Sequence, residues 1–149
     1  MDPGNKDSRM RTFEAQCRSQ GIRLTLQRRV ILEAVLDLDN HPTADRVFEA
    51  VASCAPGISR TTVYRTLETL VRMGAIGKAS HPSSVFRYDS RIETHHHLIC
   101  ERCDAVIDIS DARLDALPVP DTSALGFEVL GVRVQLRGIC RRCRDRKEQ

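Results

Sequence analysis

Four of the six cysteines stand in two C-x2-C pairs, and this spacing constrains the chain more than any other feature. The pairs are Cys100-Glu-Arg-Cys103 and Cys140-Arg-Arg-Cys143. Each pair can direct two thiolates at one ion, and two pairs make the closed tetrahedral site of structural zinc. The 36 residues between the pairs are enough for a strand, a crossover and a return strand, which would bring both pairs to one end of a small sheet. We predict one structural Zn²⁺ per chain.

Other uses of these cysteines are disulfides, two unrelated buried pairs, or an iron bound by four thiolates as in a rubredoxin-like electron carrier. Disulfides are rare in the cytosol. A catalytic zinc needs an open position, and four thiolates leave none. Cys17 and Cys54 are isolated in the sequence, and we predict that both are small buried apolar side chains.

The composition favours a globular protein of the cytoplasm. Of the 149 residues, 41% are hydrophobic and 29% are charged, which argues against disorder. No apolar run approaches the ~18–20 residues that cross a bilayer, and the start MDPGNKDSRMRT lacks the apolar segment of a secretory signal. We expect a cytoplasmic protein with no membrane partner.

The first half of the sequence predicts helices. One covers residues 8–20, and three more follow the N-cap residues Thr25, Thr43 and Ser59. Gly74 ends the last helix. The hydrophobic period then changes to two, and short strands are expected at 75–79 and 84–88 with a turn at His81-Pro82-Ser83. This order of elements is that of a winged helix-turn-helix, in which the helix after Ser59 would read DNA.

In that helix Val63, Leu67 and Leu70 recur at the spacing of a buried face. The opposite face would meet double-stranded operator DNA, and its residues are Ser59, Arg60, Thr62, Tyr64 and Arg65. Tyr64 can meet a thymine methyl group, and the arginines suit phosphates or guanine. Residues 1–88 carry 13 Lys and Arg against 9 Asp and Glu, so their net charge of +4 fits an anionic partner. An ordinary solvated surface remains the alternative for each residue.

The second half predicts strands at His96–Cys100, Ala105–Ile109 and Phe127–Arg137. The prolines in 111–125 leave room for a short helix and a loop. A shift in composition near 80–92 marks a hinge. We therefore predict an α+β protein, with a winged-helix domain at 1–88 and a small α/β domain at 89–149.

A histidine cluster leads into the first cysteine pair. In a strand His95 and His97 share one face and His96 takes the other. A hairpin would bring Asp108 beside His97, and Asp89 lies just upstream. Imidazoles and carboxylates without thiolate suit Fe²⁺ or Mn²⁺ better than Cu(I), although Zn²⁺ also accepts them. Surface histidines with loop carboxylates are the alternative interpretation.

Several blocks resemble the ferric uptake regulator family of metal-dependent bacterial repressors. In order along the chain they are GIRLTLQRRVILEAV, HPTADRVFEAV, ISRTTVYRTLETLVRMG, FRYD, HHHLICERCDAVIDI and GICRRC. The resemblance covers roughly residues 10–143. It implies a homodimeric repressor with an amino-terminal winged helix and a carboxy-terminal α/β dimerisation domain.

The resemblance also assigns residues. The structural zinc would be held by Cys100, Cys103, Cys140 and Cys143, and the regulatory metal by His41, Asp89, His95, His97 and Asp108. Arg23 would reach the minor groove or the DNA backbone.

Two departures point to a branch of the family. Asp89 and Asp108 are aspartates as in the peroxide-responsive repressors, where iron sensors usually have glutamate. Thr94 and Val132 occupy two histidine positions of a further metal site, which is therefore incomplete. Tyr64-Arg65, by contrast, resembles the iron-sensing members.

We predict a repressor that responds to peroxide and to iron or manganese, with Fe²⁺ conferring peroxide sensitivity and Mn²⁺ resistance. Iron-sensing or zinc-sensing repression are the alternatives. A metal-dependent hydrolase would need an open coordination position and a general base that no further motif supplies, so we expect no enzyme.

Overall fold

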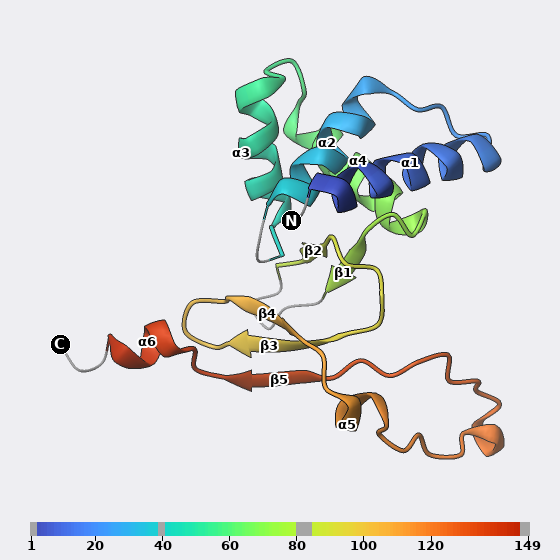
Figure 1. Cartoon of the computed structure of the whole chain (residues 1–149), viewed down its shortest axis with the longest axis vertical. Coiled ribbons are helices and arrows are strands. Elements are labelled where there is room, and N and C mark those ends of the chain that lie inside the picture. Colours follow the sequence, from blue (N-terminus) through green and yellow to red (C-terminus); the bar gives the residue numbers. More distant parts are fainter. Residues whose placement is uncertain (1–2, 39–40, 80–84, 147–149) are drawn as a thin grey trace. The chain divides into compact units, whose positions relative to one another are not determined.

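The computed structural model describes residues 3–38, 41–79 and 85–146 (Figure 1). It divides into two compact units, Met1–Ile92 and Glu93–Gln149, called here the amino-terminal and carboxy-terminal units. This division falls four residues after the predicted boundary, so Asp89 belongs to the amino-terminal unit. Across the described ranges, no helix combines the length and apolar character that a membrane span requires.

Four helices form most of the amino-terminal unit. They are α1 (Pro3–Ser19), α2 (Leu26–Asp37), α3 (Ala44–Cys54) and α4 (Arg60–Arg72). The hydroxyl groups of Thr25, Thr43 and Ser59 accept hydrogen bonds from backbone N–H groups three residues on, which confirms the three predicted N-caps. The first helix begins five residues before its predicted start.

A continuous apolar core lies between these helices. Val63, Leu67 and Leu70 of α4 have no exposed surface, which confirms the predicted buried face. They belong to one cluster with buried residues of the other helices, among them Phe13, Cys17, Ile31, Val35, Val47 and Val51. Cys17 is buried as predicted, whereas the prediction for Cys54 is wrong because its position at the end of α3 leaves it exposed.

A two-stranded wing follows α4. After Gly74, whose φ of +69° suits glycine, β1 (Gly77–Ala79) pairs antiparallel with β2 (Arg87–Asp89). Both strands are shorter than predicted, and the predicted turn His81-Pro82-Ser83 lies outside the described residues. Helices followed by this hairpin confirm the winged helix-turn-helix.

The carboxy-terminal unit is built on a three-stranded sheet with the order β4-β3-β5. Its strands are β3 (His96–Cys100), β4 (Val106–Ile109) and β5 (Gln135–Gly138). β4 runs antiparallel and β5 parallel to the central β3. The short helices are α5 (Ala112–Asp115), a 3-10 turn at Ser123–Leu125, and α6 (Arg141–Asp145). Of these, α6 was not predicted from the sequence.

The third predicted strand of this unit, Phe127–Arg137, is mostly wrong. Only Gln135–Gly138 is a strand, and residues 127–134 have no regular secondary structure. The first paired positions of β3 and β5 are His97 and Gln135. Because β3 begins at His96, the chain before Gln135 extends past the end of its neighbouring strand.

Candidate functional site

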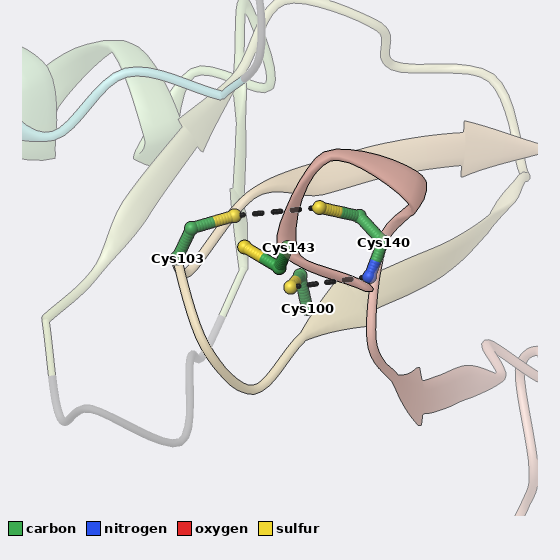
Figure 2. A group of neighbouring side chains, drawn as sticks. All are labelled: Cys100, Cys103, Cys140 and Cys143. Carbon is green, nitrogen blue, oxygen red and sulfur yellow. Dashed lines mark hydrogen bonds between the residues drawn. The ribbon is translucent and has the colours of Figure 1, made fainter. Parts of the chain in front are cut away.

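Both cysteine pairs lie at one end of the sheet because β3 and β5 are parallel. The register pairs Cys100 with Gly138, so the two strands end side by side. A tight turn after β3 carries Cys103, with Asp104 at a φ of +56°. Cys140 is the N-cap of α6, and Cys143 lies in that helix. The four side chains point toward one another (Figure 2), as the predicted return strand requires.

The distances between the four sulfurs fit a zinc ion. Any two of the Sγ atoms lie within 4.8 Å, and those of Cys103 and Cys140 are 3.7 Å apart. In a tetrahedral site with Zn–S bonds of about 2.3 Å, neighbouring sulfurs lie about 3.8 Å apart. All four are free thiols, and Cys100 and Cys143 are buried. The group therefore has the composition and spacing of a closed structural zinc site.

Hydrogen bonds from the backbone favour thiolates in this group. The N–H of Cys140 donates to Cys100 Sγ at 3.3 Å, and this bond is the main reason why the pKa of Cys100 falls to about 6. The N–H of Ala105 likewise lowers the pKa of Cys103. The hydrogen bond to Cys103 is the main cause that raises the pKa of Cys143 to about 12. Zinc binding would therefore release protons from the group.

Two arginines lie beside the cysteines, and sequence reasoning did not predict their contacts. Arg102 donates to the carbonyl oxygen of Cys143 at 3.0 Å, which ties the first turn to α6. Arg142 donates to Cys103 Sγ, and this bond raises the pKa of Arg142. Positive charge thus accompanies a donor set that carries net negative charge when it holds Zn²⁺.

A second donor group in the carboxy-terminal unit contains nitrogen and oxygen only. His95 Nε2 lies 3.0 Å from His97 Nε2 and 3.4 Å from Asp108 Oδ1, and His97 Nε2 lies 3.7 Å from the same oxygen. The β3–β4 register places His97 opposite Asp108, as the predicted hairpin requires. Both histidines are fully buried. Adjacent ligands of an octahedral ion with bonds of about 2.1 Å lie about 3.0 Å apart, so the spacing fits one metal.

The tautomer of His95 also fits a ligand. Its Nδ1 lies 2.7 Å from the carbonyl oxygen of Glu93, which can only accept a hydrogen bond. Nδ1 therefore carries the proton, and Nε2 of the neutral ring presents a lone pair toward His97 and Asp108. A backbone carbonyl that orients a ligating imidazole in this way is common in metal sites.

His96 takes the opposite face of β3, as its alternation predicted, and its contacts are structural. The backbone N–H of Val134 donates to its Nδ1 at 3.1 Å. Nε2 therefore carries the proton of the neutral ring and donates to Asp115 Oδ1 at 3.0 Å. These two bonds connect β3 to α5 and to the segment before β5, a link that the sequence did not reveal.

The remaining two predicted ligands form a pair within the amino-terminal unit. His41 Nε2 lies 3.5 Å from Asp89 Oδ2, and both side chains are buried. Hydrogen bonds from strand β2 of the wing hold the two residues together. Tyr88 N–H donates to the carbonyl oxygen of Pro42 at 2.9 Å, and the Arg87 side chain donates to the carbonyl oxygen of His41. Asp89 Oδ1 in addition accepts from the N–H of Arg91 at 2.7 Å.

The residues predicted to contact DNA lie at the start of α4 and on its exposed side. Ser59 caps the helix and hydrogen-bonds Thr62, while Arg60, Tyr64 and Arg65 are exposed. Arg23 is exposed in the loop before α2, where its carbonyl oxygen accepts a hydrogen bond from Arg28. Asp45 of α3 contacts both Arg60 and Tyr64, which sequence reasoning missed because the contact depends on how α3 packs against α4.

A comparison with protein families decides between the interpretations. The model of the ferric uptake regulator family matches residues 19–137, most of both units. The chain belongs to the ferric uptake regulator family. As a family member it is a metal-responsive transcriptional regulator and not an enzyme, in agreement with the prediction from the sequence.

Relatives of this ferric uptake regulator family member are found both in sequence and in structure. The peroxide-responsive repressor PerR of Staphylococcus aureus is 31% identical over 132 residues, which cover 89% of each chain. The ferric uptake regulator of Helicobacter pylori superposes with a TM-score of 0.75 at 18% identity, covering 93% of each chain, and shows the shared fold. The iron-containing ferric uptake regulator of Francisella tularensis gives 0.71 at 25% identity, covering 83% of this chain and 96% of its own.

Proposed function

We propose that the chain is a repressor that binds operator DNA as a homodimer when a regulatory Fe²⁺ or Mn²⁺ is bound. The observation that carries the proposal is the presence of two chemically distinct donor groups in a chain that also has a winged helix. One group is all sulfur and the other is all nitrogen and oxygen. A closed thiolate site suits a permanent structural ion, whereas an imidazole and carboxylate site suits an exchangeable one.

The zinc proposed for Cys100, Cys103, Cys140 and Cys143 would stabilise the carboxy-terminal unit. It would join the turn after β3 to α6, two segments far apart in the sequence. Since the site is closed, its role is structural and its occupancy would not report metal supply.

The regulatory ion would be bound by His95, His97 and Asp108 together with His41 and Asp89. The support within each unit is the short distance between the donors. Four of them, His41, Asp89, His95 and His97, are also buried, whereas the Asp108 side chain is 32% exposed. Five nitrogen and oxygen ligands suit Fe²⁺ or Mn²⁺ and leave one of six octahedral positions for an outside ligand. Since the five residues come from both units, bound metal would favour one relative arrangement of the two.

DNA would be read by α4 in the major groove, with Tyr64 and Arg65 at base edges and Arg23 at the minor groove or backbone. Ser59 and Thr62 would contact the backbone at the start of the helix, where N–H groups attract phosphate, and Arg60 would face the DNA beside them. All of these residues except the half-buried Thr62 are exposed, and the opposite face of the helix is buried, which supports this assignment.

A second copy of the chain would cover apolar side chains of the carboxy-terminal unit. Leu130 is 91% exposed, Leu125 82% and Phe127 65%. The segment 127–134 has the sequence of a strand but extends past its neighbour in the single chain. Pairing with the same segment of another copy would bury these residues and complete the strand.

Peroxide is the proposed signal, because both regulatory carboxylates are the aspartates typical of that branch and PerR is 31% identical to this chain. An Fe²⁺ held by these residues would supply the electron that cleaves peroxide, which Mn²⁺ would supply far less readily. His41 and His95 would be the side chains that become oxidised. Loss of these two ligands would release the ion and end repression. We place this activity in the cytoplasm.

The first experiment measures operator binding by protein that keeps its zinc but is stripped of regulatory metal, then reloaded with Fe²⁺, Mn²⁺ or Zn²⁺ in turn. We expect tight binding only after reloading with Fe²⁺ or Mn²⁺. Asp108→Asn should abolish the response, and Asp121→Asn, an exposed aspartate of the same unit, is the matched control. Binding that is independent of metal would contradict the proposal.

The second experiment tests the signal. Micromolar peroxide should add 16 Da to a peptide that contains His41 or His95 in the Fe²⁺ form and abolish DNA binding, while the Mn²⁺ form stays unmodified. An iron form that keeps its DNA binding and its unmodified histidines would favour plain iron sensing.

A further inference from the structure

One carboxylate lies among the residues proposed to read DNA. Asp45, in the first turn of α3, forms an ion pair with Arg60, the first residue of α4. The hydroxyl group of Tyr64, one turn further along α4, donates to the same Oδ1 of Asp45 at 3.4 Å. A single acidic side chain thus contacts two of the residues that are proposed to bind DNA.

Arg60 is held from a second side as well. Its guanidinium carbon lies 4.8 Å from the centre of the Phe48 ring, a cation–π contact with the next turn of α3. Asp45 and Phe48 together draw the guanidinium toward α3. The Asp45 and Arg60 side chains are nevertheless about half exposed, so the ion pair faces solvent on the side of α4 that carries Tyr64.

We propose that Asp45 is a specificity-determining residue, which restrains Arg60 from contacting phosphates of any sequence and orients Tyr64 for base contact. The proposal rests on the proposed function, since it concerns the same DNA-binding surface. In this proposal Asp45 makes no favourable contact with DNA itself. It acts by weakening the complexes with non-specific DNA.

The argument follows from what each contact can distinguish. Phosphate contacts are the same for every sequence, so an unrestrained arginine strengthens specific and non-specific binding alike. The Asp45 carboxylate offsets the charge of Arg60 and repels a phosphate at that place. Tyr64, by contrast, is proposed to meet a base, and a fixed side chain loses less entropy on binding. The carboxylate therefore weakens non-specific complexes more than specific ones.

The test compares Asp45→Asn with the wild-type, Mn²⁺-loaded protein on two duplexes. One is the duplex most enriched by repeated selection from a random pool with the wild type, and the other is its scrambled version. Asp45→Glu keeps the carboxylate. Glu49→Gln removes the same charge one turn further along α3, where Glu49 pairs with Arg46, and is the matched control. Thermal unfolding checks that all variants fold. We expect them to fold, because the N-cap Thr43 of α3 is unchanged in each.

We expect Asp45→Asn to bind the scrambled duplex at least threefold more tightly and the selected duplex no more tightly. One added phosphate contact steepens the dependence of log K on log salt by about 0.9. In an Arg60→Ala background the added slope should disappear, and Asp45→Glu and Glu49→Gln should behave as the wild type.

Three results would overturn the inference. In the first, Asp45→Asn leaves scrambled binding and its salt slope unchanged. In the second, it shifts both duplexes by the same factor. In the third, Glu49→Gln reproduces its effect, which would reduce Asp45 to a general surface charge. A wild type that shows no preference for any selected duplex would instead refute the proposed function.

Discussion

The two units of this chain are stabilised by different means. In the amino-terminal unit, side chains from α1 to α4 form one apolar cluster, and Val47, Val63 and Leu67 have no exposed surface. In the carboxy-terminal unit, the most deeply buried side chains are the donor histidines His95 and His97 and their neighbour His96, while large apolar side chains such as Leu130 are exposed. The first unit has a core of its own, whereas the second is built around potential ligands.

The difference has a physical reason. A unit as small as residues 93–149 buries little apolar surface, and such units commonly depend on a metal or on a partner chain. The carboxy-terminal unit has the features for both, with four clustered thiols and an apolar segment open to solvent. We therefore expect perturbations of metal and partner to act on this unit and leave the other folded.

The largest effect should follow from Cys140→Ser. Loss of one ligand removes the zinc and unfolds the carboxy-terminal unit, since structural zinc contributes about 10 kcal/mol or more in small modules. Zinc content by mass spectrometry and calorimetric unfolding check this result. Cys54→Ser, which changes an exposed cysteine of the other unit, should alter neither quantity. A Cys140→Ser protein with an unchanged melting temperature would refute the role of the zinc.

Leu67→Ala tests the opposite side of the comparison. It leaves a cavity in the core of the amino-terminal unit and should cost about 2–5 kcal/mol of its unfolding free energy. The zinc content should stay at one per chain. Leu26→Ala, at a residue 76% exposed on α2, should cost little and serves as the control. Zinc loss on Leu67→Ala would mean that the two units do not fold independently.

Tyr64→Ala separates DNA reading from stability. Removal of one base contact should weaken binding to the selected duplex by about 1–3 kcal/mol. Because Tyr64 is exposed, unfolding temperature and metal content should not change. Equal binding of the selected and scrambled duplexes by the wild type would rule out base reading by this helix.

Phe127→Ala addresses the proposed dimer. Truncation of this exposed aromatic ring should weaken self-association by about 1–2 kcal/mol, measured by sedimentation equilibrium. Phe86→Ala, at a ring that is 50% exposed in the wing of the other unit, is the control. An unchanged dimer dissociation constant for Phe127→Ala would remove this segment from the interface.

Local signals in the sequence predicted much of this structure. The three predicted N-caps accept hydrogen bonds from backbone N–H groups, as serine and threonine commonly do at this position; they are Thr25, Thr43 and Ser59. The predicted strand His96–Cys100 also forms. The cysteine spacing predicted the grouping of the four thiols, because this grouping requires only that two strands end side by side. The predicted hairpin likewise placed Asp108 beside His97.

The features that were missed depend on contacts between distant segments. The pairing of Asp45 with Arg60 requires the packing of α3 against α4, and the link from His96 to Asp115 requires the position of α5. Residues 127–134 of the strand predicted over Phe127–Arg137 have a suitable composition but no adjacent strand in the single chain. Composition describes what a segment can form, and its neighbours decide whether it does.

Hydrogen exchange before and after zinc removal tests the central difference between the units most directly. After chelation, amides of β3, β4 and β5 should exchange at the rate of an unfolded chain, while those of α2 and α4 keep their protection. Restoring Zn²⁺ should restore protection to the sheet. Loss of protection in both units together, or in neither, would contradict the account.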